Sequence, residues 1–193
     1  HTAYRRQRQM CIRDRCGVGL VASTEGLKSR KVVEYGIDAL KAVWHRGAID
    51  ADGKTGDGAG IHIEIPKDFF EEKIEVTGHK HDNSELCVGM IFLPRNDYSA
   101  QEQCRTIVES ELTKRNFSIY GWRQVPVDPS VLGEKAEQTR PEITQVLFTY
   151  NDKKVVNKSL EQKLYETRRV IEKEALNNHC LLYTSPSPRD VEE

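Results

Sequence analysis

Apolar residues recur along this chain with two spacings, one typical of helices and one typical of strands. The order of these helix-like and strand-like segments limits the fold more than any other feature of the sequence. Segments typical of helices cover residues 29–45, 67–73, 99–115 and 159–176; segments typical of strands cover residues 16–22, 61–65, 86–93, 119–127 and 142–150. Helices and strands in such a mixed order pack as layers around a shared core. The pattern therefore predicts an α+β domain with helices packed on sheets.

The predicted helices carry start and stop signals. The helix over 29–45 has one apolar stripe, formed by Val33, Ile37, Leu40 and Trp44, and Gly47 stands just past its end. Capping pairs predict the starts of two later helices, Ser99 with Glu102 and Ser159 with Gln162. The polar stretch 78–84 predicts an exposed loop.

The two ends of the chain differ from its middle. Residues 1–15 contain five arginines and one aspartate, and residues 180–193 contain a Ser/Pro cluster. Neither end has a periodic apolar face, so we expect neither to pack. We interpret 1–15 as a non-native segment or pro-segment, 16–179 as the front part of a domain, and 180–193 as a non-native tail, with a flexible linker as the alternative.

Composition excludes several classes of protein. The formal net charge of −1 argues against a strongly basic nucleic-acid-binding face, and no run of about 18 apolar residues is present to cross a membrane. The middle holds three widely spaced cysteines, Cys16, Cys87 and Cys104, which favour neither a disulfide framework nor a zinc site. We therefore expect a cytoplasmic protein with no nucleic-acid or membrane partner.

A metal site is the weakest of the candidate sites. His79, His81 and Asp82 are metal-ligand types, but they lie together in a polar stretch without a third distant ligand. A solvated loop is the favoured interpretation, so we expect no bound metal.

Cys16 and Arg46 are the residues best suited to chemistry. Cys16 opens a predicted strand beside two glycines, where a thiol has little cover and a substrate can approach the backbone closely. A small core residue is the alternative interpretation for this cysteine. Arg46, at the end of the first predicted helix, can hold a carboxylate in bidentate geometry, although a basic residue also suits a helix C-terminus.

A glycine-rich run follows these residues. Residues 55–60 have three glycines in five positions and lead into a predicted strand, which indicates a tight turn. Their spacing fits neither common phosphate-binding glycine motif and no helix follows, so a turn is favoured over a phosphate cradle.

Together these segments resemble the start of the class II glutamine amidotransferase domain of the glutamate synthase family. The resemblance rests on residues 16–19, 45–48, 55–61 and 65–70, and continues through 121–128, 132–134, 141–146 and 164–169. It covers residues 16 to about 176 of this chain. The run Thr-Gly-Asp-Gly-Ala-Gly-Ile at 55–61 is its most specific part.

The resemblance implies an N-terminal-nucleophile hydrolase, an αββα four-layer sandwich that is incomplete here. Cys16 would become residue one of the mature chain, where an α-amino group with a pKa of about 8 can serve as the base for its thiol. Cys16 would then attack the side-chain amide of L-glutamine and release ammonia, while Arg46 supports the pocket. The family supplies its oxyanion donors beyond this chain, so we expect this chain alone to be nearly inactive.

For the whole enzyme, the resemblance implies a flavin-binding synthase domain on the same polypeptide, where ammonia serves the reductive amination of 2-oxoglutarate. FMN, an iron–sulfur cluster and NAD(P)H or ferredoxin as electron donor belong to that part, as does a small electron-donating subunit. We expect no cofactor in this chain.

Two other functions stay open. A scaffold that has lost catalysis would serve as an interaction or regulatory module, and a mature N-terminal Cys16 would distinguish the enzyme from it. A different class II amidotransferase would pass ammonia to a sugar or nucleotide precursor, and the downstream sequence would identify it.

Overall fold

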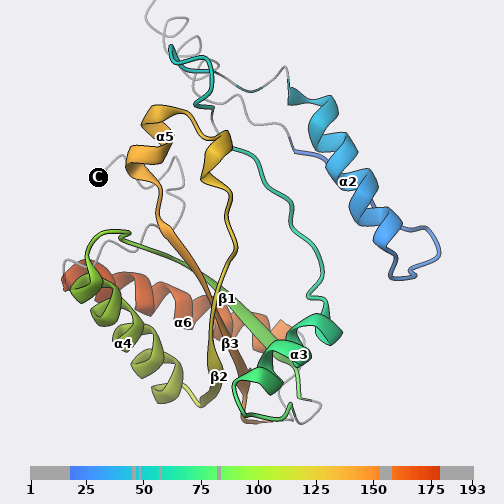
Figure 1. Ribbon diagram of the computed structural model, residues 1–193. Coiled ribbons are helices and arrows are strands. Elements are labelled where there is room, and N and C mark those ends of the chain that lie inside the picture. The colour runs from blue at the N-terminus through green and yellow to red at the C-terminus, as the bar shows by residue number, and fades with distance from the viewer. Residues whose placement is uncertain are drawn as a thin grey trace, which may run out of the picture. The chain divides into compact units, whose positions relative to one another are not determined.

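The computed structural model of this protein describes residues 18–44, 47, 49–56, 58–81, 84–152 and 158–178. The chain divides into two compact units, His1–Glu64 with Asp128–Thr139, and Ile65–Val127 with Arg140–Glu193. Helices and an antiparallel sheet are both present (Figure 1), so the predicted α+β class is confirmed. Among the described helices, none combines the length and apolar character that a membrane span requires.

Three antiparallel strands form the sheet of the second unit. They are β1 (Leu86–Leu93), β2 (Phe117–Gln124) and β3 (Glu142–Tyr150), with β3 in the middle. The bounds of β1 and β3 are those predicted from the sequence. The strand β2 begins two residues and ends three residues earlier than predicted, because Pro126 has no N–H with which to extend the ladder.

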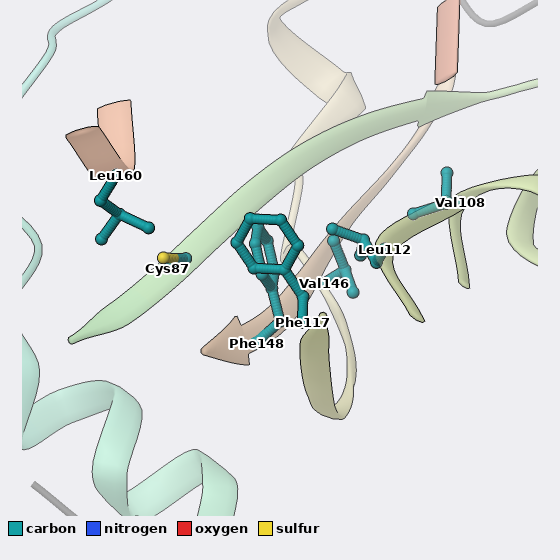
Figure 2. Packing of buried hydrophobic residues seen from close by; sticks show 7 residues of the cluster. All are labelled: Cys87, Val108, Leu112, Phe117, Val146, Phe148 and Leu160. Carbon is teal, nitrogen blue, oxygen red and sulfur yellow. The ribbon is translucent and has the colours of Figure 1, made fainter. Parts of the chain in front are cut away.

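Two helices, α4 (Tyr98–Lys114) and α6 (Lys158–Asn177), pack against each other and cover one face of this sheet. Seven buried residues form the cluster beneath them that Figure 2 shows: Cys87, Val108, Leu112, Phe117, Val146, Phe148 and Leu160. The rings of Phe117 and Phe148 meet edge to face, with centroids 5.4 Å apart, which is a favoured aromatic arrangement. The inward face predicted for α4 is confirmed by the burial of Cys104, Val108 and Leu112.

A third helix, α3 (Lys67–Val76), packs on the opposite face of the sheet. Phe70 and Ile74 of this helix contact Leu86, Tyr120 and Leu147, one residue from each strand. The helix predicted over 67–73 is thus present and continues three residues further.

A bulge in β2 lies beside the end of α3. The pairing of β2 with β3 shifts register between Ile119 and Gly121, and the Thr77 hydroxyl lies 3.0 Å from the carbonyl oxygen of Tyr120. Gly121 has a φ of 153°, and a Cβ there would lie 3.0 Å from the methyl carbon of Thr77. Both the backbone angle and the space therefore require glycine at this position.

The helix α4 begins with a different cap residue from the one predicted. Asp97, in extended conformation, accepts a hydrogen bond of 2.9 Å from the N–H of Ala100, whereas Ser99 lies inside the helix. The prediction of Ser99 as cap is wrong because an aspartate two residues earlier already occupies the capping geometry. Ser159, the other predicted cap, likewise lies within α6, which begins at Lys158.

Replacing Asp97 by alanine should lower the free energy of unfolding by about 1 kcal/mol, because the first turn of α4 loses its side-chain acceptor. The Ser99→Ala variant should change the same quantity by only a few tenths of a kcal/mol, since serine and alanine differ little inside a helix. Urea denaturation of both variants measures the difference. Equal destabilisation by the two substitutions would contradict the assignment of Asp97 as the cap.

The first unit contains α2 (Arg30–Ala42), the 3-10 helix η2 (Pro129–Val131) and α5 (Glu134–Thr139). The Ser29 hydroxyl caps α2 by accepting from the N–H of Lys31 at 3.2 Å. No residue of α2 is fully buried. Val33, Ile37 and Leu40 of the predicted apolar stripe are half-buried, whereas Trp44 is 72% exposed. The helix ends earlier than predicted, and Gly47 donates to the Trp44 carbonyl in a separate turn instead of capping the helix.

Two predicted strands do not form in the part of the chain that the structure describes. Residues 18–22 and 61–65 have no regular structure, and Leu20 and Ile61 are 91% and 48% exposed. An alternating pattern forms a strand only where another strand accepts its backbone hydrogen bonds, and no described strand pairs with either segment. Cys16 and Gly17, where the first of these strands was expected to start, lie outside the described residues.

Candidate functional site

The two residues predicted to carry the chemistry, Cys16 and Arg46, lie outside the described residues, as do His45, Ala48 and Asp57. The structure does describe the segments on either side of Arg46 and Asp57. The geometry of the candidate site is therefore given by Gly47, residues 49–56 and residues 58–60.

A short hairpin, residues 49–56, connects the Arg46 segment to the glycine-rich run. Ile49 and Gly56 form an antiparallel bridge, and the Asp50 N–H donates to the Thr55 carbonyl at 2.8 Å. Gly53 makes the turn with a φ of 68°, a left-handed conformation that favours glycine. We call residues 49–56 the motif hairpin, because its bridge pairs Ile49, which directly follows the motif at 45–48, with Gly56 in the motif at 55–61.

The Asp52 side chain stabilises the turn of the motif hairpin through hydrogen bonds within the turn. Its carboxylate accepts from the N–H groups of Lys54 at 3.0 Å and Thr55 at 2.7 Å, and from the Thr55 hydroxyl at 2.5 Å. These bonds hold the pKa of Asp52 well below its usual range, and the bond from the Thr55 hydroxyl has the largest effect. The carboxylate is thus occupied by its own loop. This turn precedes residues 55–60, over which the sequence predicts a tight turn; Asp57, within that run, lies outside the described residues.

The segment Asp128–Thr139 packs on the motif hairpin at Gly133. A Cβ on Gly133 would lie within 3.0 Å of the Thr55 hydroxyl, the Asp52 carboxylate and the Thr55 amide nitrogen. Only glycine leaves room for the hairpin at this point, because two of these atoms are held by the turn and one is backbone. The requirement comes from this close approach, since the φ of Gly133 is not positive.

An ion pair adds a second attachment between the same two segments. The Lys135 ammonium lies 2.7 Å from the carboxylate of Asp50. This hydrogen bond raises the pKa of Lys135 and lowers the pKa of Asp50. Both groups therefore remain charged at neutral pH.

The glycines after the motif hairpin leave the backbone uncovered. Gly58 has a φ of 84°, so the backbone conformation requires glycine there. Gly60 has no such angle, and no described atom lies within 4 Å of the place where a Cβ would stand. The next described helix, α3, begins at Lys67, so the run lacks the helix N-terminus on which the common phosphate-binding glycine motifs depend.

His81 departs from its predicted setting. Its side chain is only 6% exposed, its Nδ1 lies 3.1 Å from the Glu71 carboxylate, and its ring meets the Tyr120 ring edge to face. The prediction of a solvated loop over 78–84 is wrong at this residue, because the Tyr120 and Glu71 side chains take the place of water. Asp82, its predicted companion, lies outside the described residues.

The described residues do not suit a metal or iron–sulfur cluster. They include no three His, Cys, Asp or Glu side chains close enough together to hold a metal ion. The described cysteines, Cys87 and Cys104, are both buried, and burial raises the pKa of the Cys87 thiol to about 12. A buried thiol of this kind is a poor ligand and a poor nucleophile.

Sequence reasoning did not identify Asp50, Asp52, Gly133 or Lys135 as parts of the site. The segment 132–134 was among the runs that carried the family resemblance, which is the one signal that pointed to Gly133. Lys135 and Asp50 are 85 positions apart, and a single sequence has no pattern that pairs residues at that separation.

Comparison with known proteins gives one family and several relatives. Residues 16–189 match the family described as glutamine amidotransferases class-II. The chain is 54% identical over 160 residues to the glutamate synthase [NADPH] large chain of Azospirillum brasilense, a match that covers 83% of this chain and 10% of that protein. It is 37% identical over 163 residues to ferredoxin-dependent glutamate synthase 2, chloroplastic, of Arabidopsis thaliana, with the same coverage. The chain thus spans about a tenth of the length of these relatives.

Proposed function

Because this chain belongs to the class II glutamine amidotransferases, we propose that it is the front part of the glutamine-hydrolysing domain of a glutamate synthase, with Cys16 as its nucleophile. The observation that carries this proposal is the family match, which starts at Cys16 and continues to residue 189. The 54% identity to a glutamate synthase large chain supports the choice of that enzyme among amidotransferases.

The proposed reaction hydrolyses L-glutamine to glutamate and ammonia. The Cys16 sulfur attacks the side-chain amide carbon, the C–N bond breaks, and the nitrogen leaves as ammonia after taking up a proton. Water then cleaves the glutamyl thioester and restores the thiol. A free α-amino group on Cys16, exposed by removal of residues 1–15, would accept and return the proton.

Arg46 is proposed as a support of the glutamine pocket. Its guanidinium would hold a carboxylate in bidentate geometry. The motif hairpin supports this role, because it pairs Ile49, the residue after 48, with Gly56, the residue before 57. Gly58 and Gly60 would let the substrate approach the backbone closely.

For the longer polypeptide, we propose that ammonia passes to a flavin-binding synthase domain that converts 2-oxoglutarate to glutamate. FMN and an iron–sulfur cluster would supply electron transfer there, with NAD(P)H or ferredoxin as donor and a small electron-donating subunit as partner. The relatives' names mention NADPH and ferredoxin as alternatives. The described residues include no three His, Cys, Asp or Glu side chains placed to hold a metal ion, and we propose that both groups belong to the rest of the longer polypeptide.

The proposal extends to domain organisation. Residues 16–179 would form part of an αββα four-layer sandwich in which the β1–β3–β2 sheet is one of two sheets. Residues 1–15 would lie outside that domain. Residues 180–193 were expected to lie outside it too, but the family match continues to residue 189. The widely spaced cysteines favour a reducing compartment, which we propose is the cytoplasm.

The function is tested with the full-length polypeptide that begins at Cys16. Incubated with L-glutamine alone, it should release glutamate and ammonia in equal amounts, as an enzyme-coupled ammonia assay measures. L-Asparagine, one methylene shorter, is the matched control and should release far less ammonia. No ammonia from glutamine would contradict the enzyme and favour the non-catalytic module.

A further inference from the structure

The ion pair between Lys135 and Asp50 has no part in the proposed chemistry. Its two charged atoms are 2.7 Å apart, and the side chains are 61% and 38% exposed. Exposed ion pairs contribute little to stability, because water and salt screen them. The pair does join one point of the motif hairpin to the start of α5, so we consider its effect on geometry.

Asp50, which pairs with Lys135, is also bonded into both sides of the motif hairpin. It follows Ile49, which bridges to Gly56, and its own N–H donates to the Thr55 carbonyl. A displacement of Asp50 would therefore move the segments that lead to residues 45–48 and 57–60. These are the segments to which the proposed function assigns the glutamine pocket.

Lys135 is itself held in place by its neighbour Gly133. The close approach of Gly133 to Thr55 and Asp52 fixes the backbone two residues before Lys135. The Gly133 carbonyl also accepts from the N–H of Glu137 at 3.0 Å, which fixes the first turn of α5. Two attachments so close together leave the hairpin little freedom to tilt on the Asp128–Thr139 segment.

We propose that Lys135 is a positioning residue for glutamine binding: through Asp50, it holds the motif hairpin in the geometry that the glutamine pocket requires. This inference rests on the proposed function. Because Lys135 acts through Asp50 and touches no reacting atom in this scheme, its loss should weaken substrate binding more than it slows the chemical step.

The test uses the full-length polypeptide that begins at Cys16 and separates KM from kcat. Lys135→Met removes the charge and keeps the length of the side chain; it should raise the KM for L-glutamine roughly three- to tenfold and change kcat by less than about twofold. Lys135→Arg should restore most of the lost affinity. Asp50→Asn, which removes the charge of the other partner in the ion pair, should raise KM by a similar factor.

Lys28→Met is the matched control. It breaks another exposed ion pair of the same unit, Lys28 with Glu64 at 2.5 Å, which does not involve the motif hairpin. The KM of Lys28→Met for L-glutamine should equal that of the wild type. A double variant that combines Asp50→Asn with Lys135→Met should have a KM no higher than that of either single variant, because both substitutions break the same contact.

The outcomes distinguish this inference from the proposed function. A wild type that hydrolyses glutamine, with unchanged KM in both Lys135→Met and Asp50→Asn, overturns the positioning role and leaves the proposed function standing. An equal rise in KM for Lys28→Met also overturns the positioning role, because the effect would then be general. A wild type that hydrolyses no glutamine overturns the proposed function, and the inference with it.

Discussion

Replacing Cys16 by alanine in the full-length polypeptide should reduce ammonia release from glutamine by more than about a thousandfold, because the reaction loses its proposed nucleophile. Binding of glutamine should change much less, since alanine fills most of the space of cysteine. The measurement is kcat/KM for ammonia release, together with the dissociation constant for glutamine. Comparable turnover in the Cys16→Ala variant would show that another group attacks the amide.

Two matched changes make this experiment specific. Cys87→Ala removes a buried thiol whose pKa is raised to about 12, and it should leave the rate of ammonia release close to that of the wild type. One extra residue in front of Cys16 converts its α-amino group to an amide and should slow the reaction roughly a hundredfold or more, because the proposed base is lost. An unchanged rate in that extended protein would contradict the α-amino group as base.

Replacing Gly133 by alanine should displace the motif hairpin and lower the free energy of unfolding by roughly 1–3 kcal/mol, at the upper end of that range. The added Cβ would meet the Thr55 amide nitrogen, the Thr55 hydroxyl and the Asp52 carboxylate. None of these atoms can move without breaking the turn. Thermal unfolding and hydrogen exchange at the Asp50 and Thr55 amides measure the effect, and protection should fall at both amides.

Gly60→Ala is the control for that substitution. No described atom lies within 4 Å of its Cβ position and its φ is not positive, so the fold should accept the methyl group with a change of less than about 0.5 kcal/mol. Equal destabilisation by Gly133→Ala and Gly60→Ala would contradict the close approach at Gly133.

The elements that the sequence predicted well are those with local signals. The strand β1 is an unbroken run of apolar residues and glycine that ends before Pro94, and β3 is rich in β-branched and aromatic residues. The helix α4 has its buried positions three or four residues apart. The segments 18–22 and 61–65 show the limit of such signals. Their patterns suit strands, but a strand also needs a partner, and a pattern of residues does not identify one.

The candidate site likewise contains residues that the sequence pointed to and residues whose contacts only the structure shows. Cys16 and Arg46 were proposed from residue chemistry and family resemblance, and they remain predictions. The contacts of Lys135 with Asp50 and of Gly133 with Thr55 became visible only in the fold, because they join distant parts of the chain. His81 shows the converse: its polar neighbours in sequence indicated water, whereas its neighbours in space are Tyr120 and Glu71.

The separation of Asp50 and Lys135 by 85 positions also sets an order of events during synthesis. At typical elongation rates of 5–20 residues per second, Lys135 is made roughly 4–17 s after Asp50. During that interval Gly133 and Lys135 are absent, and the turn of the motif hairpin depends on hydrogen bonds within residues 49–56. The local hydrogen bonds of Asp52 thus give the nascent loop a shape before the segment that will hold it has left the ribosome.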